Sequence, residues 1–370
     1  MSQLWRLLVE DGVGAAEGLA LDEALMARYA REEPERAPTL RLYSYRDHCA
    51  LVGRYQNIDA EIDLAACRRT GTDVNRRLSG GGAIVMGSGQ LGVAFFDRVR
   101  TAARPRETIA ALSAALAAGL AELGITASFR GKNDLEVRGR KIAGLGLYVD
   151  QSGAMLFHAS VLADLDVAFM LQVLKIPAAK LADRAAPSVT ERLTTVSAET
   201  GVAHDATTLR PVIAAGFAAA FGIELQLGTP EGPEQALAQA LEADRYRSES
   251  WLNERGAAED SGGTALLKTP AGLARIYLST RGDLIKSAMV VGDFNELPPC
   301  VVAMESGLRW RRLDHDAILA VVTSSGAAGA LGVAPELLAG AVIEAGRESR
   351  ERDVAEPMQV PDPDSGPGPG

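Results

Sequence analysis

The order of apolar and polar residues along the first part of the chain predicts alternating strands and helices. Residues 4–10 are typical of a strand, and residues 17–31 place leucine and methionine at the spacing of an amphipathic helix. Residues 40–45 and 50–55 are expected to form a pair of strands, followed by a helix over 59–69. The pattern therefore predicts a domain in which strands and helices are mixed.

The middle of the chain is expected to hold a glycine-rich loop and a meander of three strands. A strand over 73–78 leads into the loop, and strands over 84–86 and 92–96 form the next pair. An alanine-rich helix follows over 105–124. The meander strands are expected at 135–137, 141–149 and 154–162.

The pattern changes near residue 246, which predicts a second domain. Helices expected at 164–174, 208–221 and 231–241 precede the change, and residues 348–370 are charged and then rich in proline and glycine, which is typical of a disordered tail. We therefore expect domains over 1–245 and 246–347. The second domain is expected to contain strands at 265–268, 273–279 and 284–291 and helices at 317–322 and 335–345.

Composition narrows the class of protein. A length of 370 residues fits two domains, and a net charge of −10 argues against nucleic acid as the main partner. The three cysteines lack CxxC spacing, so a disulfide scaffold or zinc ribbon is not expected, and a reducing cytoplasm fits. No signal peptide is seen, and the most apolar helix, 109–121, is shorter than the ~20 residues that span a membrane. We expect a cytoplasmic protein that does not cross a membrane.

The segment over residues 76–85, Arg-Arg-Leu-Ser-Gly-Gly-Gly-Ala-Ile-Val, is the first candidate for chemistry. Glycine lets backbone N–H groups approach a ligand closely, and successive N–H groups form a concave anion site. Arg77 adds a planar fork that suits carboxylate or phosphate oxygens. The alternative is a tight turn flanked by two solvated arginines.

A second candidate lies over residues 130–146 and includes Asn-Asp, a turn and Gly-Arg-Lys. Only six lysines accompany thirty-two arginines in the chain, so Lys141 is a candidate for a compact point charge, although an ordinary turn lysine is the alternative. Strand alternation would put Lys141, Ala143, Leu145 and Leu147 on one face.

Together these segments resemble the lipoate–protein ligase family of the biotin/lipoate ligase superfamily, in its long form with a C-terminal accessory domain. The family pattern RRxSGGGAV, GRNDL, GRKxSG and FHHGTLL is similar to residues 76–85, 131–135, 139–144 and 157–162. The resemblance implies an α+β fold with a class-II-synthetase- and biotin-ligase-like mixed sheet flanked by helices, and a smaller α/β accessory domain.

The chain departs from the family pattern at two places. Met86-Gly87 stands where the family has His-Asp, and Gln90 stands where it has Asn. His158 is a single histidine where the family has two, so it could be a hydrogen-bonded core residue instead of a pocket residue.

The resemblance implies an ATP-dependent lipoate–protein ligase, which forms lipoyl-AMP and transfers the lipoyl group to a lysine of an acceptor domain. That acceptor would be a lipoyl domain of a 2-oxoacid dehydrogenase acyltransferase or the glycine-cleavage H protein. Lys141 is the expected catalytic residue, Asp134 the expected Mg²⁺ ligand, and 177–195 the loop that closes over the acyl-adenylate. The implied ATP-binding residues are Arg77, Gly82, Ala83, Ile84, Val85, Asn133, Asp134 and Lys141, and the implied lipoate-binding residues are Arg77, Ser79, Gly80, Gly81, Gly82, Lys141, Gly144 and His158.

Two other functions stay open. Octanoyl- and lipoyl-transferases of this fold need no adenylation, but they use a cysteine as acyl carrier, and the chain has no cysteine between Cys67 and Cys300. Biotin ligases carry a Gly-Arg-Gly-Arg loop that is absent here. The other function that stays open is a non-catalytic acyl-binding homologue. The presence of both Arg77 and Lys141 argues against it.

Overall fold

The chain folds into two units in a computed structural model. The first unit comprises the chain up to Gly256 together with Asp293–Glu296, and the second comprises Ala257–Gly292 and the chain from Leu297 onward. The structure describes residues 3–30, 36–99, 105–130, 133–175, 189–257 and 261–355.

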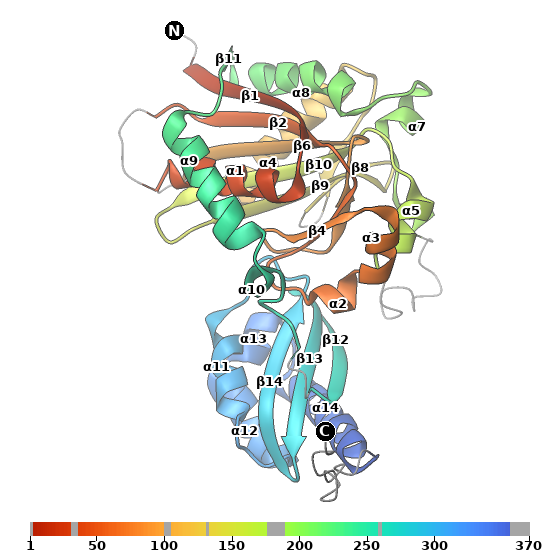
Figure 1. The fold of residues 1–370 in the computed structure, drawn as a ribbon, viewed down its shortest axis with the longest axis vertical. Coiled ribbons are helices and arrows are strands. Elements are labelled where there is room, and N and C mark those ends of the chain that lie inside the picture. The colour runs from red at the N-terminus through yellow and green to blue at the C-terminus, as the bar shows by residue number, and fades with distance from the viewer. Residues whose placement is uncertain are drawn as a thin grey trace, which may run out of the picture. The chain divides into compact units, whose positions relative to one another are not determined.

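An eight-stranded mixed sheet forms the frame of the first unit, in the order β11-β1-β2-β6-β10-β9-β8-β7 (Figure 1). Strands β11 and β2 run parallel to β1, and every other neighbouring pair is antiparallel. The expected α+β class with a mixed sheet is confirmed. The strands are β1 (Gln3–Val13), β2 (Thr39–Tyr45), β6 (Gln90–Arg98), β7 (Ser128–Arg130), β8 (Asp134–Val137), β9 (Arg140–Val149), β10 (Ala154–Leu162) and β11 (Ile223–Leu227).

Helices cover both faces of this sheet because neighbouring strand residues point to opposite sides. Phe95 packs in the core beneath α4 and α8, whereas Phe96 packs in the core beneath α1. The pair α1 and α9 lie side by side on the second face (Figure 1). These helices are α1 (Ala15–Ala27), α4 (Pro105–Ala121), α8 (Ala206–Phe221) and α9 (Gly232–Leu241).

A separate three-stranded sheet carries the glycine-rich loop. Its order is β4-β3-β5, with β3 parallel to β4 and antiparallel to β5. The expected pairing of 40–45 with 50–55, and of 84–86 with 92–96, is therefore wrong. The turn after β2 moves the chain into the smaller sheet, so the sequence neighbours belong to different sheets. Its strands are β3 (Cys49–Val52), β4 (Asp73–Arg76) and β5 (Ile84–Met86).

The helix expected over 59–69 is interrupted and forms α2 (Ile58–Glu61) and α3 (Leu64–Thr70). Ile62 is extended and bridges to Leu174, and the Asp63 side chain then accepts a hydrogen bond that caps α3. A polar side chain that offers the backbone another partner is a common cause of such a helix boundary. The other short helices of this unit are α5 (Val167–Val173), η1 (Thr190–Arg192), α7 (Val196–Thr200), η2 (Glu242–Tyr246) and α10 (Glu249–Leu252).

The second unit is a three-stranded antiparallel sheet, β12-β13-β14, packed with helices. Helix α11 was missed because its segment opens with consecutive prolines, and proline at a first helical turn is tolerated. The elements are β12 (Gly263–Thr269), β13 (Gly272–Arg281), β14 (Leu284–Gly292), α11 (Pro299–Leu308), α12 (His315–Ser325), α13 (Ala327–Leu331) and α14 (Pro335–Ala355).

Two expected boundaries differ from the structure. The first unit extends to Gly256 instead of ending at 245, because β4 side chains hold the carbonyls of Tyr246, Trp251 and Leu252. Helix α14 runs to Ala355, so the first residues of the expected tail over 348–370 are helical, and 356–370 lie outside the described residues. Within the described ranges, no helix is both long enough and apolar enough to span a bilayer.

Candidate functional site

The glycine loop between β4 and β5 is held by contacts so close that side chains would not fit. A Cβ on Gly53 would lie 2.0 Å from the Gly81 carbonyl oxygen, and one on Gly80 would lie 2.0 Å from the Phe294 carbonyl oxygen. Gly81 has φ +90° and donates its N–H to that same Phe294 carbonyl, at 2.8 Å. Glycine is needed here for close approach and for positive φ.

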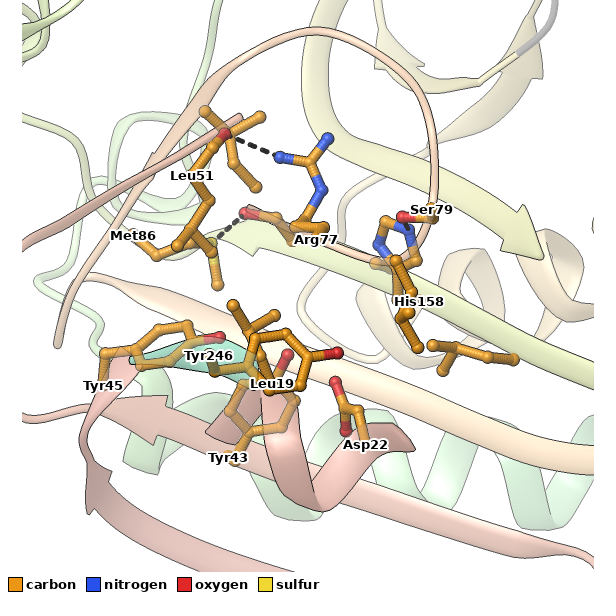
Figure 2. A pocket seen from close by; sticks show the side chains of 15 residues that line it. Leu19, Asp22, Tyr43, Tyr45, Leu51, Arg77, Ser79, Met86, His158 and Tyr246 are labelled. Carbon is orange, nitrogen blue, oxygen red and sulfur yellow. Dashed lines mark hydrogen bonds between the residues drawn. The ribbon is translucent and has the colours of Figure 1, made fainter. Parts of the chain in front are cut away.

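Arg77 is buried in the wall of a cavity behind this loop. Its terminal nitrogens donate to the carbonyls of Leu51 at 2.7 Å, Gly80 at 3.2 Å and Gly82 at 2.9 Å, and Figure 2 shows the contact to Leu51. The fork expected to be free for an anion is thus largely used to shape the loop. Its Nε is buried without a hydrogen-bond partner among the described residues, and burial lowers the pKa of Arg77 to about 10.

Arg76, next in the chain, has a structural role that sequence reasoning missed. Its side chain is fully buried and donates to the carbonyls of Gly53, Arg54 and Gln56 on one segment, and of Trp251 and Leu252 on another. Arg76 therefore ties the segment after α9 to the turn beneath the glycine loop. The arginine pair itself was the signal in the sequence for this role. Successive side chains of a strand point to opposite sides, so two adjacent arginines meet different surroundings.

Ser79 and His158 meet inside the cavity (Figure 2). The Ser79 hydroxyl and the His158 Nε2 are 2.5 Å apart. Burial, with the charge of Arg77 adding, lowers the pKa of His158 to about 3, so the ring is neutral near pH 7. Gly146 on the neighbouring strand makes room for the ring, because a Cβ there would lie 2.3 Å from Nε2. His158 is a pocket residue that is also hydrogen-bonded.

The cavity itself is narrow and lies between the large sheet, α1 and the small sheet. Its volume is about 30 Å³, and most of its wall is apolar. The sequence did not predict that Asp22, Tyr43 and Tyr246 add polar groups to this wall. Asp22 stands inside the apolar run of α1, and such an aspartate is a sign of a buried polar site. Burial raises the pKa of Asp22 to about 6, although Arg41 beside it acts in the opposite direction. The cavity is lined by Leu19, Asp22, Tyr43, Tyr45, Leu51, Arg77, Leu78, Ser79, Ile84, Met86, Leu156, His158, Ala159, Ser160 and Tyr246.

Lys141 lies on the strand beside this cavity and not in its wall. Its Nζ is 2.7 Å from a carboxylate oxygen of Asp134, and it would be 3.1 Å from a Cβ on Gly144. Gly144 pairs with Ser160, a wall residue of the cavity, and neighbouring strands lie ~4.8 Å apart. The amine therefore lies one strand away from the wall. Residues 193–194, at the end of the expected closing loop, run beside it, and Thr194 donates its N–H to the Lys141 carbonyl at 2.9 Å.

The expectation that Lys141 shares a face with Ala143, Leu145 and Leu147 is wrong for Lys141 alone, because the strand contains a bulge. Lys141 pairs with Glu136 and Ala143 pairs with Leu135, which leaves Ile142 as an extra residue. Ile142, Ala143 and Leu145 therefore face the core under α4 and α8, while the Lys141 amine lies on the side of Gly144.

Met86 gives the cavity a thioether where the resembling family has histidine. It is buried, lines the cavity, and its sulfur accepts a hydrogen bond from the Ser160 hydroxyl at 2.8 Å. At the next position, a Cβ on Gly87 would lie 2.6 Å from His48, whose ring stacks 4.2 Å from that of Phe169. Where the family has His-Asp, this chain therefore has Met86 as an apolar wall residue and Gly87 beside a space that the His48 ring fills.

Among the described residues, which include all three cysteines, no thiol lines the cavity. Cys49 and Cys67 are buried, burial raises the pKa of both, and Cys300 belongs to the second unit. A thiol with a raised pKa is a poor nucleophile near neutral pH.

The residues expected to form the site divide into three groups. Those in the cavity wall are Arg77, Ser79, Ile84 and His158, and those around the Lys141 amine are Asp134 and Gly144. The third group lies elsewhere: Gly80, Gly81 and Gly82 form the loop, Ala83 and Val85 pack in a small core under β3, and Asn133 accepts the N–H of Leu145 through its carbonyl.

Two parts of the expected site lie outside the described residues. These are 131–132, which precede Asn133, and 176–188, most of the expected closing loop. Among the described residues there is also no group of three or more His, Cys, Asp or Glu side chains that could hold a metal ion.

Comparison with known proteins identifies the family of this chain. Residues 14–218 match the model of the lipoyl protein ligase A/B catalytic domain. An octanoyltransferase LipM from Symbiobacterium thermophilum is 29% identical over 276 residues, covering 68% of this chain and 98% of that protein. Lipoate-protein ligase A subunit 1 from Thermoplasma acidophilum is 29% identical over 256 residues, covering 66% of this chain and 94% of that protein.

Solved structures share the fold. A bi-partite lipoate protein ligase from T. acidophilum has a TM-score of 0.61 at 27% identity and covers 70% of this chain and 99% of that chain. P. falciparum LipL1 in complex with lipoate has a TM-score of 0.68 and covers 86% of this chain and 94% of that chain, but at 15% identity it supports the fold alone. Because the family model matches more than half of the sequence, the chain belongs to the lipoyl protein ligase A/B catalytic-domain family, whose members include lipoate–protein ligases and octanoyltransferases.

Proposed function

We propose that this protein binds an acyl carboxylate of the lipoate class, activates it with ATP and attaches the acyl group to a lysine of an acceptor domain. The observation that carries the proposal is Arg77. It is a buried guanidinium without an ion-pair partner among the described residues, and its Nε faces no acceptor at the cavity wall. A buried charge that lacks a counter-ion is costly, which favours an anionic ligand.

Activation by ATP would give a role to Lys141, the second cationic group near the cavity. A carboxylate is a poor acyl donor, and an anhydride with AMP makes its leaving group good. The reaction requires two anions to meet, and positive potential from Arg77, the loop N–H groups and Lys141 would oppose their repulsion. In this proposal Lys141 exchanges its contact with Asp134 for oxygens of the phosphate and acyl carbonyl.

Mg²⁺ would accompany ATP in the same proposal. Mg²⁺ is usually held by one or two carboxylates together with substrate phosphates. The single carboxylate of Asp134 would therefore be enough for Mg²⁺ bound with ATP, although it would not be enough for a metal held only by protein ligands. Asn133 supplies a further oxygen nearby in the chain. Bound Mg²⁺ would neutralise phosphate charge.

The acceptor is proposed by analogy with the relatives. The T. acidophilum ligase structure is described together with an E2 lipoyl domain. A lipoyl domain of a 2-oxoacid dehydrogenase acyltransferase, or the glycine-cleavage H protein, is therefore the acceptor to test first.

A second candidate is acyl transfer without adenylation. Most of the named relatives are octanoyltransferases, and this favours a transferase over the ligase that the sequence predicted. One feature of the chain favours the ligase. All three cysteines lie in the part of the chain that the structure describes, and none of their thiols lines the cavity to carry the acyl group.

The two candidates separate in one experiment on the whole chain. Acceptor domain is incubated with lipoate, ATP and Mg²⁺, or with an octanoyl thioester and no ATP, while pyrophosphate release is measured. If the protein is a ligase, the acceptor is modified only when ATP is present, and one pyrophosphate is released for each acyl group attached. Modification from the thioester alone establishes the transferase, and acyl binding with neither reaction leaves a non-catalytic acyl-binding protein.

The role of Lys141 has its own test. We expect Lys141→Ala to lower the rate of ATP-dependent modification at least ~100-fold, the size of a lost charge-stabilising group. Circular dichroism would check that the variant stays folded. Wild-type rates in this variant would show that Lys141 has no part in the reaction.

A further inference from the structure

A second cavity lies behind the first, and Leu78 is the one described residue that lines both. The second cavity has a volume of about 220 Å³, against about 30 Å³ for the first. The two are back to back. Asp22 and Glu23 are adjacent on α1, and Leu156 in the first wall is the register partner of Tyr148 in the second.

The first cavity is too narrow for an acyl chain as it stands. A volume of about 30 Å³ has room for only two or three water molecules, since each needs ~10–15 Å³. The walls formed by Tyr45, Leu51 and Met86 are at most 2% exposed and are packed in the core beneath α1. A ligand must therefore displace a wall that is less constrained.

Leu78 is such a wall. Its side chain is partly exposed and lies at a bend of the glycine loop. The backbone is fixed on both sides, because Arg77 donates its N–H to Val52 at 2.9 Å and Ser79 accepts the N–H of Arg54 at 2.9 Å. The side chain can thus turn without the loop moving, and the space behind it is the larger cavity.

The second cavity differs in chemistry from the first. Glu23 and Arg245 form an ion pair in its wall, Arg54 stacks 4.3 Å from the Trp251 ring centroid, and Asp150 completes the polar lining. Met26, Ala27 and Leu78 form the apolar part of its wall, against which an acyl chain can pack. A hydroxyl at the far end of the chain would meet hydrogen-bonding groups.

We propose that Leu78 is a movable partition that determines which acyl chains the site accepts. The inference rests on the proposed acyl-binding function. When the acyl chain enters, the Leu78 side chain turns toward the second cavity, and its bulk sets the length limit. Removing that bulk joins the cavities, so the site then takes straight-chain carboxylates longer than the eight-carbon chain, including those with a terminal hydroxyl.

The test is direct binding of a series of straight-chain carboxylates, from six to twelve carbons, to the whole protein by calorimetry. Each buried methylene contributes enough for about a fourfold change in affinity. We expect Leu78→Ala to raise the affinity for decanoate relative to octanoate roughly tenfold over wild type. Leu78→Phe should shift the preference toward hexanoate, and it keeps the test decisive if the alanine variant does not fold.

Leu237→Ala is the matched control. Leu237 is an exposed residue of α9 that lines neither cavity. We expect its decanoate-to-octanoate ratio to stay within about threefold of wild type. An unchanged chain-length profile in both Leu78 variants, with octanoate bound by wild type, overturns the partition alone. A wild-type protein that binds none of the series overturns the proposed function and the partition with it.

Discussion

Two adjacent arginines show how different the roles of neighbouring residues can be. Arg76 and Arg77 follow one another in one strand and loop, and both lack a carboxylate ion pair among the described residues. Arg76 is completely used by five backbone carbonyls, whereas Arg77 keeps an unpartnered Nε at the cavity. The sequence could suggest a cation near the glycines, but not which arginine lines the cavity, because the carbonyls come from distant segments.

Arg77→Gln should weaken binding of an acyl anion specifically. A hydrogen bond to a charged group contributes ~1.5–3 kcal/mol, so we expect octanoate to bind about 10- to 100-fold more weakly. Octanamide, which has the same chain and no charge, is the control ligand and should lose much less. An equal loss for both ligands would show that Arg77 supports the cavity without contacting the carboxylate.

His158 should make the first unit less stable in mild acid. Its pKa is lowered to about 3 in the folded state from an ordinary value of 6.5, so the unfolded chain binds more protons between these values. Stability from this group is complete above pH 6.5 and is lost as the pH falls toward 3. Between pH 7 and pH 5 the loss should be about 2 kcal/mol.

The comparison variant is His158→Gln, which keeps a polar side chain near Ser79 and cannot titrate. Urea unfolding at both pH values gives the difference between the two proteins. The difference cancels the contribution of Asp22, whose raised pKa acts in the opposite sense by favouring the folded state at lower pH. Parallel losses in wild type and variant would mean that His158 is not buried as a neutral ring.

Among the strands, the small residues of β9 leave room for side chains of the neighbouring strand β10, such as His158, to reach the cavity. Gly144 and Gly146 face the site, and the bulge at Ile142 brings Lys141 to the same side. The glycines could be read from the sequence as a place where a ligand or side chain approaches. The bulge could not, because it depends on how β8 pairs with β9 and has no fixed sequence signal.

Gly146→Ala should disturb the site through one clash. Its Cβ would lie 2.3 Å from His158 Nε2, and overpacking of this kind usually costs ~1–3 kcal/mol. We expect that loss in urea unfolding together with weaker octanoate binding. Gly232→Ala in α9 of the same unit is the control, since nothing among the described residues lies within 4 Å of the added atom, and there stability should hold or rise slightly. A Gly146 variant as stable as the control would mean that the ring moves freely.

The sequence predicted elements better than their partners. Long periodic segments such as α4, α8 and β10 lie close to their expected positions. The pairing of β3 and β5 was not predictable, because one turn after Tyr45 transfers the chain to another sheet. The cavity behind the glycine loop was predicted only in part, since Asp22, Tyr43 and Tyr246 reach it from segments that local pattern does not connect.

At the scale of the whole molecule, the chain has two units with separate cores. Each should therefore unfold in its own transition, and a ligand that binds the first unit should raise that transition by mass action. At 100 times the dissociation constant, lipoate should add about 2.7 kcal/mol to the first unit.

Gly263→Ala tests the independence of the second unit. Its Cβ would lie 1.7 Å from the Ala345 carbonyl oxygen, so we expect the second transition to fall in calorimetry by several degrees. Lipoate affinity and the first transition should stay at wild-type values. A fall of both transitions together would show that the two units unfold as one.

Intact-mass spectrometry of an unmodified lipoyl domain, after incubation with the whole protein, lipoate, ATP and Mg²⁺, tests ATP-dependent lipoyl attachment most directly. We expect one added lipoyl group on one lysine, dependent on ATP and strongly reduced in Arg77→Gln. An unchanged acceptor mass with every donor tried, or full modification by Arg77→Gln, would overturn the proposed function.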